Sequence, residues 1–209
     1  MTDWYKIVTF ASTIRKMAGR PKIFDQQTAL EKASKLFWDK GYESTSLDDL
    51  TTAMGIQKGS FYNTFGSKKQ LFIETIKLYE KLSFDEYERL LEETENPIEL
   101  IKAFFLHCAD SPKSEHLKGC FAGNTLAELT GIDEELTIDA KKYLTGLENI
   151  FFEQISIAQK NKTIKNQTEP KILARYLLNL WNGINITRRI YQSNEDLKPL
   201  IEFQLSILN

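Results

Sequence analysis

The chain has few of the residues on which several protein classes depend. Its 209 residues include two cysteines, two histidines and five prolines. Cys108 and Cys120 have no zinc-site spacing and no secretory leader before them, which argues against a disulfide framework and against a metal site. Near His107 and His116 there is no Ser-rich elbow, Gly-rich phosphate loop or paired carboxylate motif. The sequence therefore predicts no metal, no cofactor and no enzymatic activity.

Long apolar runs are also missing. No stretch approaches the roughly 18 residues that a bilayer span requires. The longest run near the N-terminus, Ile7–Ala11, contains Thr9 and is too short for a signal-peptide core. We therefore expect a cytoplasmic protein with no membrane partner. With 42% apolar and 27% charged residues, the composition is that of a globular chain with a sizeable core.

The charge is distributed unevenly although the net value is only −2. Residues 1–70 contain 11 lysines and arginines against 7 acidic residues, a balance of +4, and residues 71–209 contain 16 against 22, a balance of −6. A basic N-terminal part on an acidic remainder indicates that a polyanion such as DNA binds at one end of the molecule.

Apolar side chains recur at spacings of three and four along almost the whole chain, and no segment alternates as a strand does. We therefore expect an all-α fold of about nine helices. Capping residues mark three N-terminal helices, from Asp25 to Gly41, from Ser46 to Met54 and from Lys58 to Phe65. Further helices are expected over residues 68–91, 98–109, 119–129, 133–160, 170–192 and 194–208, with a loop around Pro112.

The second and third of these helices, joined by a tight turn at Gly55, have the form of a helix-turn-helix, whose second helix enters the major groove. If Phe61 and Phe65 are buried, that helix exposes polar groups able to reach base edges and phosphates. These groups belong to Lys58, Ser60, Tyr62 and Asn63. Gly59 has no side chain, so the start of the helix can approach the duplex closely. The alternative is that these residues are merely the solvated face of a small bundle.

Two other helix starts are candidates for phosphate binding. Thr45 and Ser46 precede one helix, and Ser67 and Lys68 precede or begin another. Exposed N–H groups at such positions attract anions without reading the base sequence.

The same region resembles the signature of the TetR family of transcription regulators. It reads GYESTSLDDL over residues 41–50, GIQKGSFY over 55–62 and NTFGSKKQLF over 63–72. The resemblance implies phosphate contacts by Thr45, Tyr62 and Lys68, and it places Lys58, Gly59 and Asn63 in or beside the groove. Thr64 departs from the histidine or tyrosine that is common at its position in the family.

The family's architecture implies a DNA-binding domain over residues 20–67 and a ligand-sensing and dimerisation domain over 68–209, connected by the helix 68–91. Residues 1–19 would be an extension. Met17–Lys22 resembles a natural start, so residues 1–16 are either a misplaced start or a real arm. An arm could add contacts to phosphates or to the minor groove through Arg15, Lys16, Arg20 and Lys22.

The last two helices carry more apolar surface than one intramolecular stripe requires. We expect them to form a four-helix bundle with a second copy, a homodimer that matches a palindromic double-stranded operator. The alternative is that they belong to the monomer core. The expected interface residues are Tyr176, Leu177, Leu180, Trp181, Ile184, Leu197, Ile201 and Leu205.

The effector domain contains candidates for recognising a small apolar or electrophilic molecule. An apolar pocket is expected around Phe104, Phe121 and Trp181 with Asn124 or Asn185 as polar anchors, although aromatic residues at helical spacing also suit a plain core. Cys120, at an expected helix start after Lys118, is either a thiolate-forming sensor or a small buried apolar residue.

The residues 119–128 and 180–183 also resemble the branch of the family that contains the repressor of N-ethylmaleimide reductase, whose members can sense electrophiles or oxidants through a cysteine. The expected function is therefore a repressor that a small molecule or a cysteine modification releases from DNA. A helical enzyme subunit and an interaction adaptor without DNA binding are the alternatives.

Overall fold

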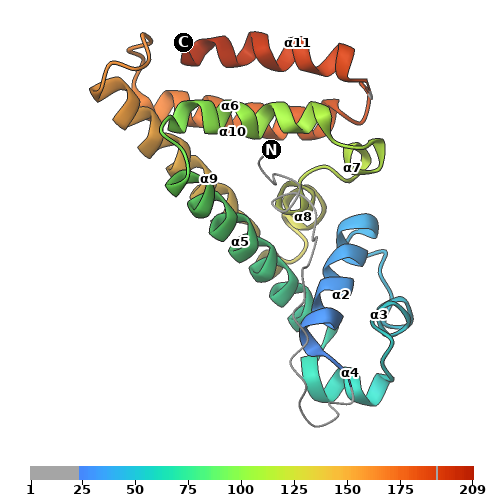
Figure 1. Ribbon diagram of the computed structural model, residues 1–209. Helices are drawn as coiled ribbons and strands as arrows, with labels where there is room; N and C mark the ends of the chain where they lie inside the picture. The colour runs from blue at the N-terminus through green and yellow to red at the C-terminus, as the bar shows by residue number, and fades with distance from the viewer. Residues whose placement is uncertain (1–23, 192) are drawn as a thin grey trace. The chain divides into compact units, whose positions relative to one another are not determined.

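The computed structural model describes residues 24–191 and 193–209, and within them the fold is all-α (Figure 1). The residues expected as an N-terminal extension, 1–19, lie outside this part of the chain. The helices are α2 (Gln26–Lys40), α3 (Leu47–Met54), α4 (Lys58–Phe65), α5 (Lys68–Glu92), α6 (Pro97–Asp110), α7 (Lys113–Lys118), α8 (Phe121–Leu129), α9 (Glu134–Lys160), α10 (Pro170–Thr187), α11 (Asn194–Leu205) and the 3-10 turn η1 (Ser206–Leu208).

Each helix expected from the sequence is present, and three details differ. The expected loop around Pro112 contains α7, which is too short for an apolar periodicity to reveal it. Helix α10 ends at Thr187, not near residue 192, because the N–H groups of Arg189 and Ile190 turn back onto the carbonyls of Ile186 and Thr187. Helix α11 ends at Leu205, and the 3-10 turn η1 follows it.

The described residues form two compact units. Unit 1 comprises residues 24–87 with 124–140, and unit 2 comprises 88–123 with 141–209. Helices α5, α8 and α9 each contribute residues to both units. Residues 124–140, which follow the first part of unit 2 in the sequence, therefore belong structurally to unit 1.

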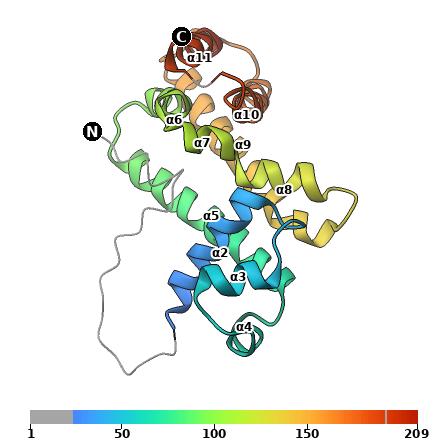
Figure 2. The same ribbon diagram turned by 90° about the vertical axis from the view of Figure 1, so that its right-hand side faces the viewer.

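In unit 1, helices α2, α3 and α4 form a small three-helix arrangement (Figure 2). The Asp25 side chain accepts from the N–H of Gln27 at 3.2 Å and caps α2, which ends at Gly41 with a φ of 84°. The core of the unit is aromatic, with Phe37 and Phe72 in edge-to-face contact at 4.9 Å between ring centroids. This packing fixes α2 against the start of α5.

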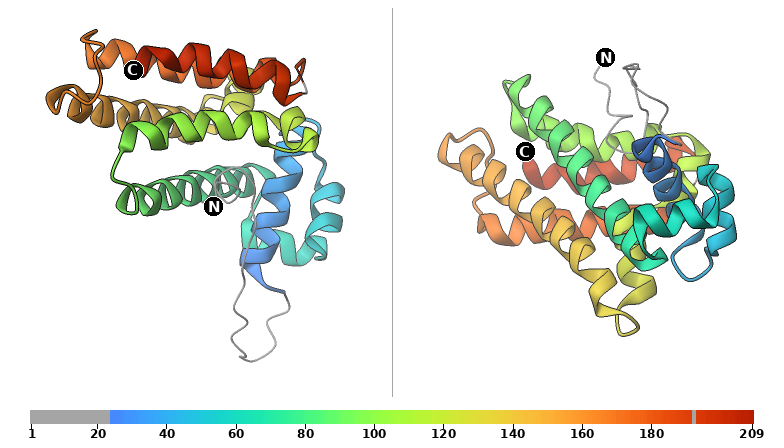
Figure 3. Two further views of the ribbon diagram at one scale, coloured as in Figure 1. Left: turned by 45° about the horizontal axis from the view of Figure 1, so that its top comes forward. Right: turned by 90° about the horizontal axis from the view of Figure 1, so that it is seen from below.

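In unit 2, helices α6, α10 and α11 lie side by side (Figure 3). Phe104 of α6 stacks on Trp181 of α10 at 4.5 Å between centroids, and Phe105 lies 5.7 Å from Phe151 of α9. All four rings are buried. No helix among the described residues is long and apolar enough to cross a membrane.

Candidate nucleic-acid interface

The turn between α3 and α4 is built by Gly55, which adopts a left-handed conformation with φ 70° and ψ 36°. Its N–H and that of Ile56 both return to the carbonyl of Thr51, closing the end of α3. Phe61 and Phe65 are at most 1% exposed, as the spacing predicts. Helix α4 is thereby anchored by one face and presents the other to solvent.

The outer face of α4 carries the side chains expected from the sequence. Lys58, Gly59, Tyr62 and Asn63 are exposed and Ser60 is half-buried. A Cβ built on Gly59 meets nothing within 4 Å, so the backbone is open there. Gln57, the N-cap, makes no side-chain capping bond, and the first turn holds no acidic residue. This helix start is therefore suited to approach an anionic backbone.

Lys58 is held by a residue that sequence reasoning did not single out. Its Nζ lies 2.6 Å from Oδ1 of Asp48 on α3, and both side chains are well exposed. Hydrogen bonding to Asp48 raises the pKa of Lys58. The pair places a carboxylate beside the proposed DNA-facing cation, and no motif in the sequence marks it.

The start of α3 is occupied by its own capping box, which corrects the expectation that the N–H groups of Thr45 and Ser46 are free. The Ser46 N–H donates to Oδ2 of Asp49 at 3.0 Å, and the Ser46 Oγ accepts from the Asp49 N–H. The hydrogen bonds that the Ser46 N–H, the Ser46 hydroxyl and Lys40 donate to the Asp49 carboxylate lower the pKa of Asp49 to about 2. Thr45 is fully buried, its Oγ1 donating to the Gly41 carbonyl at 2.6 Å and its N–H to that of Tyr42. Neither amide is available to a phosphate in this conformation.

At the start of α5, Ser67 acts as the N-cap. Its Oγ accepts from the N–H of Gln70 at 3.0 Å. Its own N–H donates to the carbonyl of Phe65, which corrects the expectation that this N–H is open to a phosphate. The Nζ of Lys68 lies 4.3 Å from the centre of the Tyr42 ring. Lys68 is thus positioned by a cation–π contact, which leaves its charge accessible to a phosphate.

Residues from the second sequence segment of unit 1 hold this region together. The Glu128 carboxylate accepts from the N–H groups of Tyr42 at 3.0 Å and Glu43 at 2.8 Å. Lys69 pairs with Asp133 at 2.8 Å and Glu135 at 2.7 Å, and these bonds raise its pKa. The sequence gives no local signal for these contacts because the partners are far apart along the chain.

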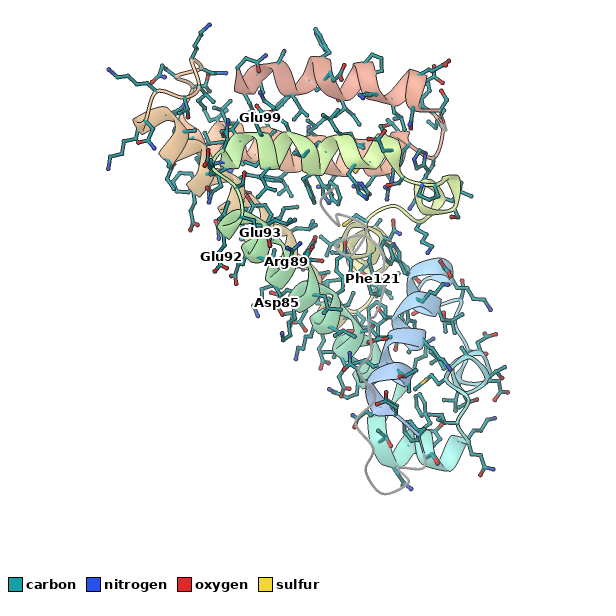
Figure 4. The ribbon with its side chains drawn as sticks, in the orientation of Figure 1. Asp85, Arg89, Glu92, Glu93, Glu99 and Phe121 are labelled. Carbon is teal, nitrogen blue, oxygen red and sulfur yellow. The ribbon has the colours of Figure 1, made fainter. Side chains whose placement is uncertain are left out.

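The expected effector residues are mostly packed side chains. Phe104, Phe121 (Figure 4), Trp181 and Asn185 are 5% exposed or less, and all belong to unit 2. Asn124 is half-buried and belongs to unit 1. The stacked rings of Phe104 and Trp181 form core, which is the second interpretation offered by the sequence.

Of the two interpretations of Cys120 that the sequence offers, the burial of the residue favours the small buried apolar residue. The thiol is 3% exposed, and burial raises its pKa, although a hydrogen bond from the Gly123 N–H and the positive charge of Arg188 act in the opposite direction. Burial raises the pKa of the Cys108 thiol to about 11. Desolvation outweighs the helix start because the sulfur lies inside unit 2.

The residues expected at the dimer interface are core residues of the single chain, which corrects that assignment. Seven of the eight are 6% exposed or less. The eighth, Tyr176, is half-buried and donates from its hydroxyl to the carbonyl of Gln204 on α11 at 3.1 Å. They hold α10 and α11 within unit 2, so a partner subunit must use other side chains.

Three short helices, a left-handed glycine turn and a second helix with an open polar face define a DNA-binding protein of the helix-turn-helix class. A family profile described as "Bacterial regulatory proteins, tetR family" matches residues 29–75, and one described as "Tetracyclin repressor-like, C-terminal domain" matches residues 97–202. The chain belongs to the TetR family of bacterial transcription regulators.

Relatives of similar length support this assignment. The chain is 31% identical over 189 residues to the transcriptional repressor ComR of Escherichia coli, covering 90% of each chain. It is 28% identical to the uncharacterised regulator YezE of Bacillus subtilis, covering 91% of this chain and 100% of that one.

Two solved structures show the same architecture. A cysteine-substituted form of the TetR family regulator CifR, complexed with 26-bp operator DNA, matches with a TM-score of 0.77 at 27% identity, covering 91% of this chain and 100% of that one. Reduced NemR of E. coli matches with a TM-score of 0.77 at 21% identity, covering 88% and 96% respectively. The NemR likeness concerns the fold alone.

Proposed function

We propose that the protein is a dimeric repressor that inserts α4 into the major groove of a palindromic operator and is released by a small effector. The observation that carries the proposal is the open outer face of α4, beside a helix start without acidic residues. The description of ComR as a repressor and the operator complex of CifR support it. Its place of action is then the bacterial cytoplasm, and it has no enzymatic activity of its own.

The exposed groups of α4 have different roles. Tyr62, 54% exposed, presents its hydroxyl to a phosphate, and Lys68 presents its ammonium to a phosphate. Asn63 reads a base edge, since its amide can both donate and accept. Lys58, Gly59 and Ser60 line the approach to the groove. We propose residues 20–67 as the DNA-binding domain and 68–209 as the sensing and dimerisation domain.

The dimer uses the apolar side chains that unit 2 leaves exposed on α10 and α11. Ile172 and Ile186 on α10 are 54% and 55% exposed, and Leu200 and Phe203 on α11 are 36% and 77% exposed. Gly183 is also exposed, and a Cβ there would meet nothing within 4 Å. Apolar groups gathered on two neighbouring helices around a glycine suit close helix packing with a second copy.

The test is quantitative binding of the full chain to DNA from upstream of its own gene at several salt concentrations. We expect Tyr62→Phe and Lys68→Ala to weaken operator and non-operator binding alike, each lowering the salt slope by about one unit. Asn63→Ala should mainly relax specificity at one base position. Lys160→Ala, an exposed lysine at the end of α9, is the control. Unchanged binding in both phosphate variants would exclude this interface.

A further inference from the structure

One face of α10 carries polar groups buried in unit 2. Trp181 and Asn185 of α10 and its C-cap Arg188, whose backbone angles are still helical, follow at spacings of four and three, which places them on the same side of the helix. Their exposed fractions are 3%, 3% and 0%. Their ordinary explanation would be a hydrogen-bonding network that joins α10 to the core of unit 2.

The described residues do not provide that network. The Nε, Nη1 and Nη2 atoms of Arg188 are buried, and none has a hydrogen-bond partner among them. The Asn185 amide donates through Nδ2 to the Trp181 carbonyl at 2.8 Å, but its Oδ1 is buried without a donor. A set of strong donors thus lies one turn from an unused acceptor.

The charge makes this arrangement unusual. A guanidinium stays protonated, and burying it without an anion is strongly unfavourable. Its positive charge lowers the pKa of Cys108 and Cys120, against the larger effect of burial. Burial and then Arg188 lower the pKa of His107, on which Asp110 acts in the opposite direction. No described carboxylate is paired with it. The fold therefore holds a cation whose natural complement is an anion from outside the chain.

We propose that this face of α10 is the binding site for a small organic carboxylate with an apolar body. The Arg188 guanidinium donates to both carboxylate oxygens, a hydroxyl or amide of the ligand donates to Asn185 Oδ1, and the body contacts the Phe104–Trp181 pair. A single cation with apolar neighbours suits a monoanion better than a phosphate dianion. That the bound anion acts as the effector rests on the function proposed above.

The same contacts explain how binding would be transmitted. Phe104 and Trp181 are stacked at 4.5 Å between centroids. A ligand body entering beside Arg188 separates these rings and so moves α6 relative to α10. A packed core responds to such an insertion by switching between discrete arrangements.

The first test needs no ligand. Arg188→Met keeps much of the side-chain volume and removes the unpaired charge, so the variant, dialysed at low salt, should melt about 3 °C or more above wild type. Arg175→Met on the exposed side of the same helix should change the melting temperature little. A clear fall in the melting temperature of Arg188→Met would overturn the proposal, because it would show that the protein itself compensates the charge.

The second test uses acetate, octanoate, benzoate and 4-hydroxybenzoate, with benzamide and 4-hydroxybenzamide as uncharged matches. We expect 4-hydroxybenzoate to raise the melting temperature of wild type more than its amide does, and the difference to vanish in Arg188→Met. Equal shifts for acid and amide, a shift that survives in Arg188→Met, or no shift with any carboxylate would each overturn the site.

Operator binding is measured separately on the same samples. The carboxylate should release wild type from the operator, and it should not change the operator affinity of Arg188→Met measured on the same variant without ligand. If wild type binds no operator but shows the Arg188-dependent shift, the proposed function fails and the anion site stands. If it binds the operator but shows no such shift, the reverse holds.

Discussion

Lys58 and Asp48 show how one residue can limit the affinity of a binding surface. The carboxylate lies 2.6 Å from the ammonium that, in the proposed complex, α4 offers to DNA. In that complex Lys58 exchanges this partner for a phosphate or a base edge, and Asp48 is left beside the negative duplex. An exposed pair of this kind stabilises the free protein little.

We therefore predict that Asp48→Asn increases DNA affinity about threefold to tenfold at low salt, with a steeper salt dependence. Fluorescence anisotropy at several salt concentrations measures both quantities. Asp85→Asn on α5 (Figure 4), where the carboxylate also pairs with a lysine in the same exposed manner, is the matched control. Weaker binding by Asp48→Asn would mean that Asp48 holds Lys58 in its binding position.

The cysteines give a second prediction at this scale, with a definite pH dependence. Because burial raises both thiol pKa values, the thiolate fraction at pH 7 is smaller than in the unfolded chain. Iodoacetamide should label both native cysteines at least about tenfold more slowly than the denatured protein, and the rate should rise as pH increases from 7 to 9. Mass spectrometry of Cys108→Ser and Cys120→Ser separates the sites. Faster labelling of Cys120 in the native state would restore it as a sensor.

At the scale of elements, the contact between α8 and the loop after α2 determines how firmly the DNA-binding helices are held. The Glu128 carboxylate accepts from two consecutive backbone N–H groups, those of Tyr42 and Glu43. Gly41 is adjacent, with φ +84°, and a Cβ there would lie 2.8 Å from Glu128 Oε2. The close approach and the backbone conformation both require glycine.

Removing this acceptor should leave both N–H groups unpaired. We predict that Glu128→Ala lowers the free energy of unfolding by about 1–3 kcal/mol, and that Glu128→Gln, which keeps one acceptor oxygen, loses less. Denaturant unfolding measures the change. Glu153→Ala, an exposed glutamate on α9, serves as the control and should stay close to wild type. An equal decrease in the free energy of unfolding for Glu128→Ala and the control would show that the Glu128 carboxylate does not stabilise the loop.

The elements themselves were predictable because their signals are local. Asp25, Ser46 and Gly55 mark helix ends within a few residues, and Phe61 with Phe65 fixes the buried side of α4. The hydrogen bonds of the Glu128 carboxylate were not predictable, since Tyr42 lies 86 residues away and a single sequence does not reveal pairing at that distance. On α10 and α11, apolar residues occur on both faces, so the pattern could not separate core from exposed surface.

At the scale of the whole molecule, the exposed apolar side chains of α10 and α11 lead to a prediction of assembly. Ile186→Asp and Phe203→Asp should convert the proposed dimer to a monomer at micromolar concentration and weaken operator binding, because a monomer reads only one half-site. Sedimentation velocity measures the mass. Ile138→Asp, on α9 and 57% exposed, is the control. A wild-type chain that sediments as a monomer would refute the interface.

The division of unit 1 between two sequence segments also sets an order in time during synthesis. Domains generally fold as they leave the ribosome, N-terminal parts first. Here Tyr42 and Lys69 are translated long before Glu128 and Asp133, which complete their surroundings. The N-terminal helices of a nascent chain therefore lack the contacts with Glu128 and Asp133 until residue 140 has emerged. A regulator built this way acquires its finished DNA-binding head only after much of its sensing region has also been made.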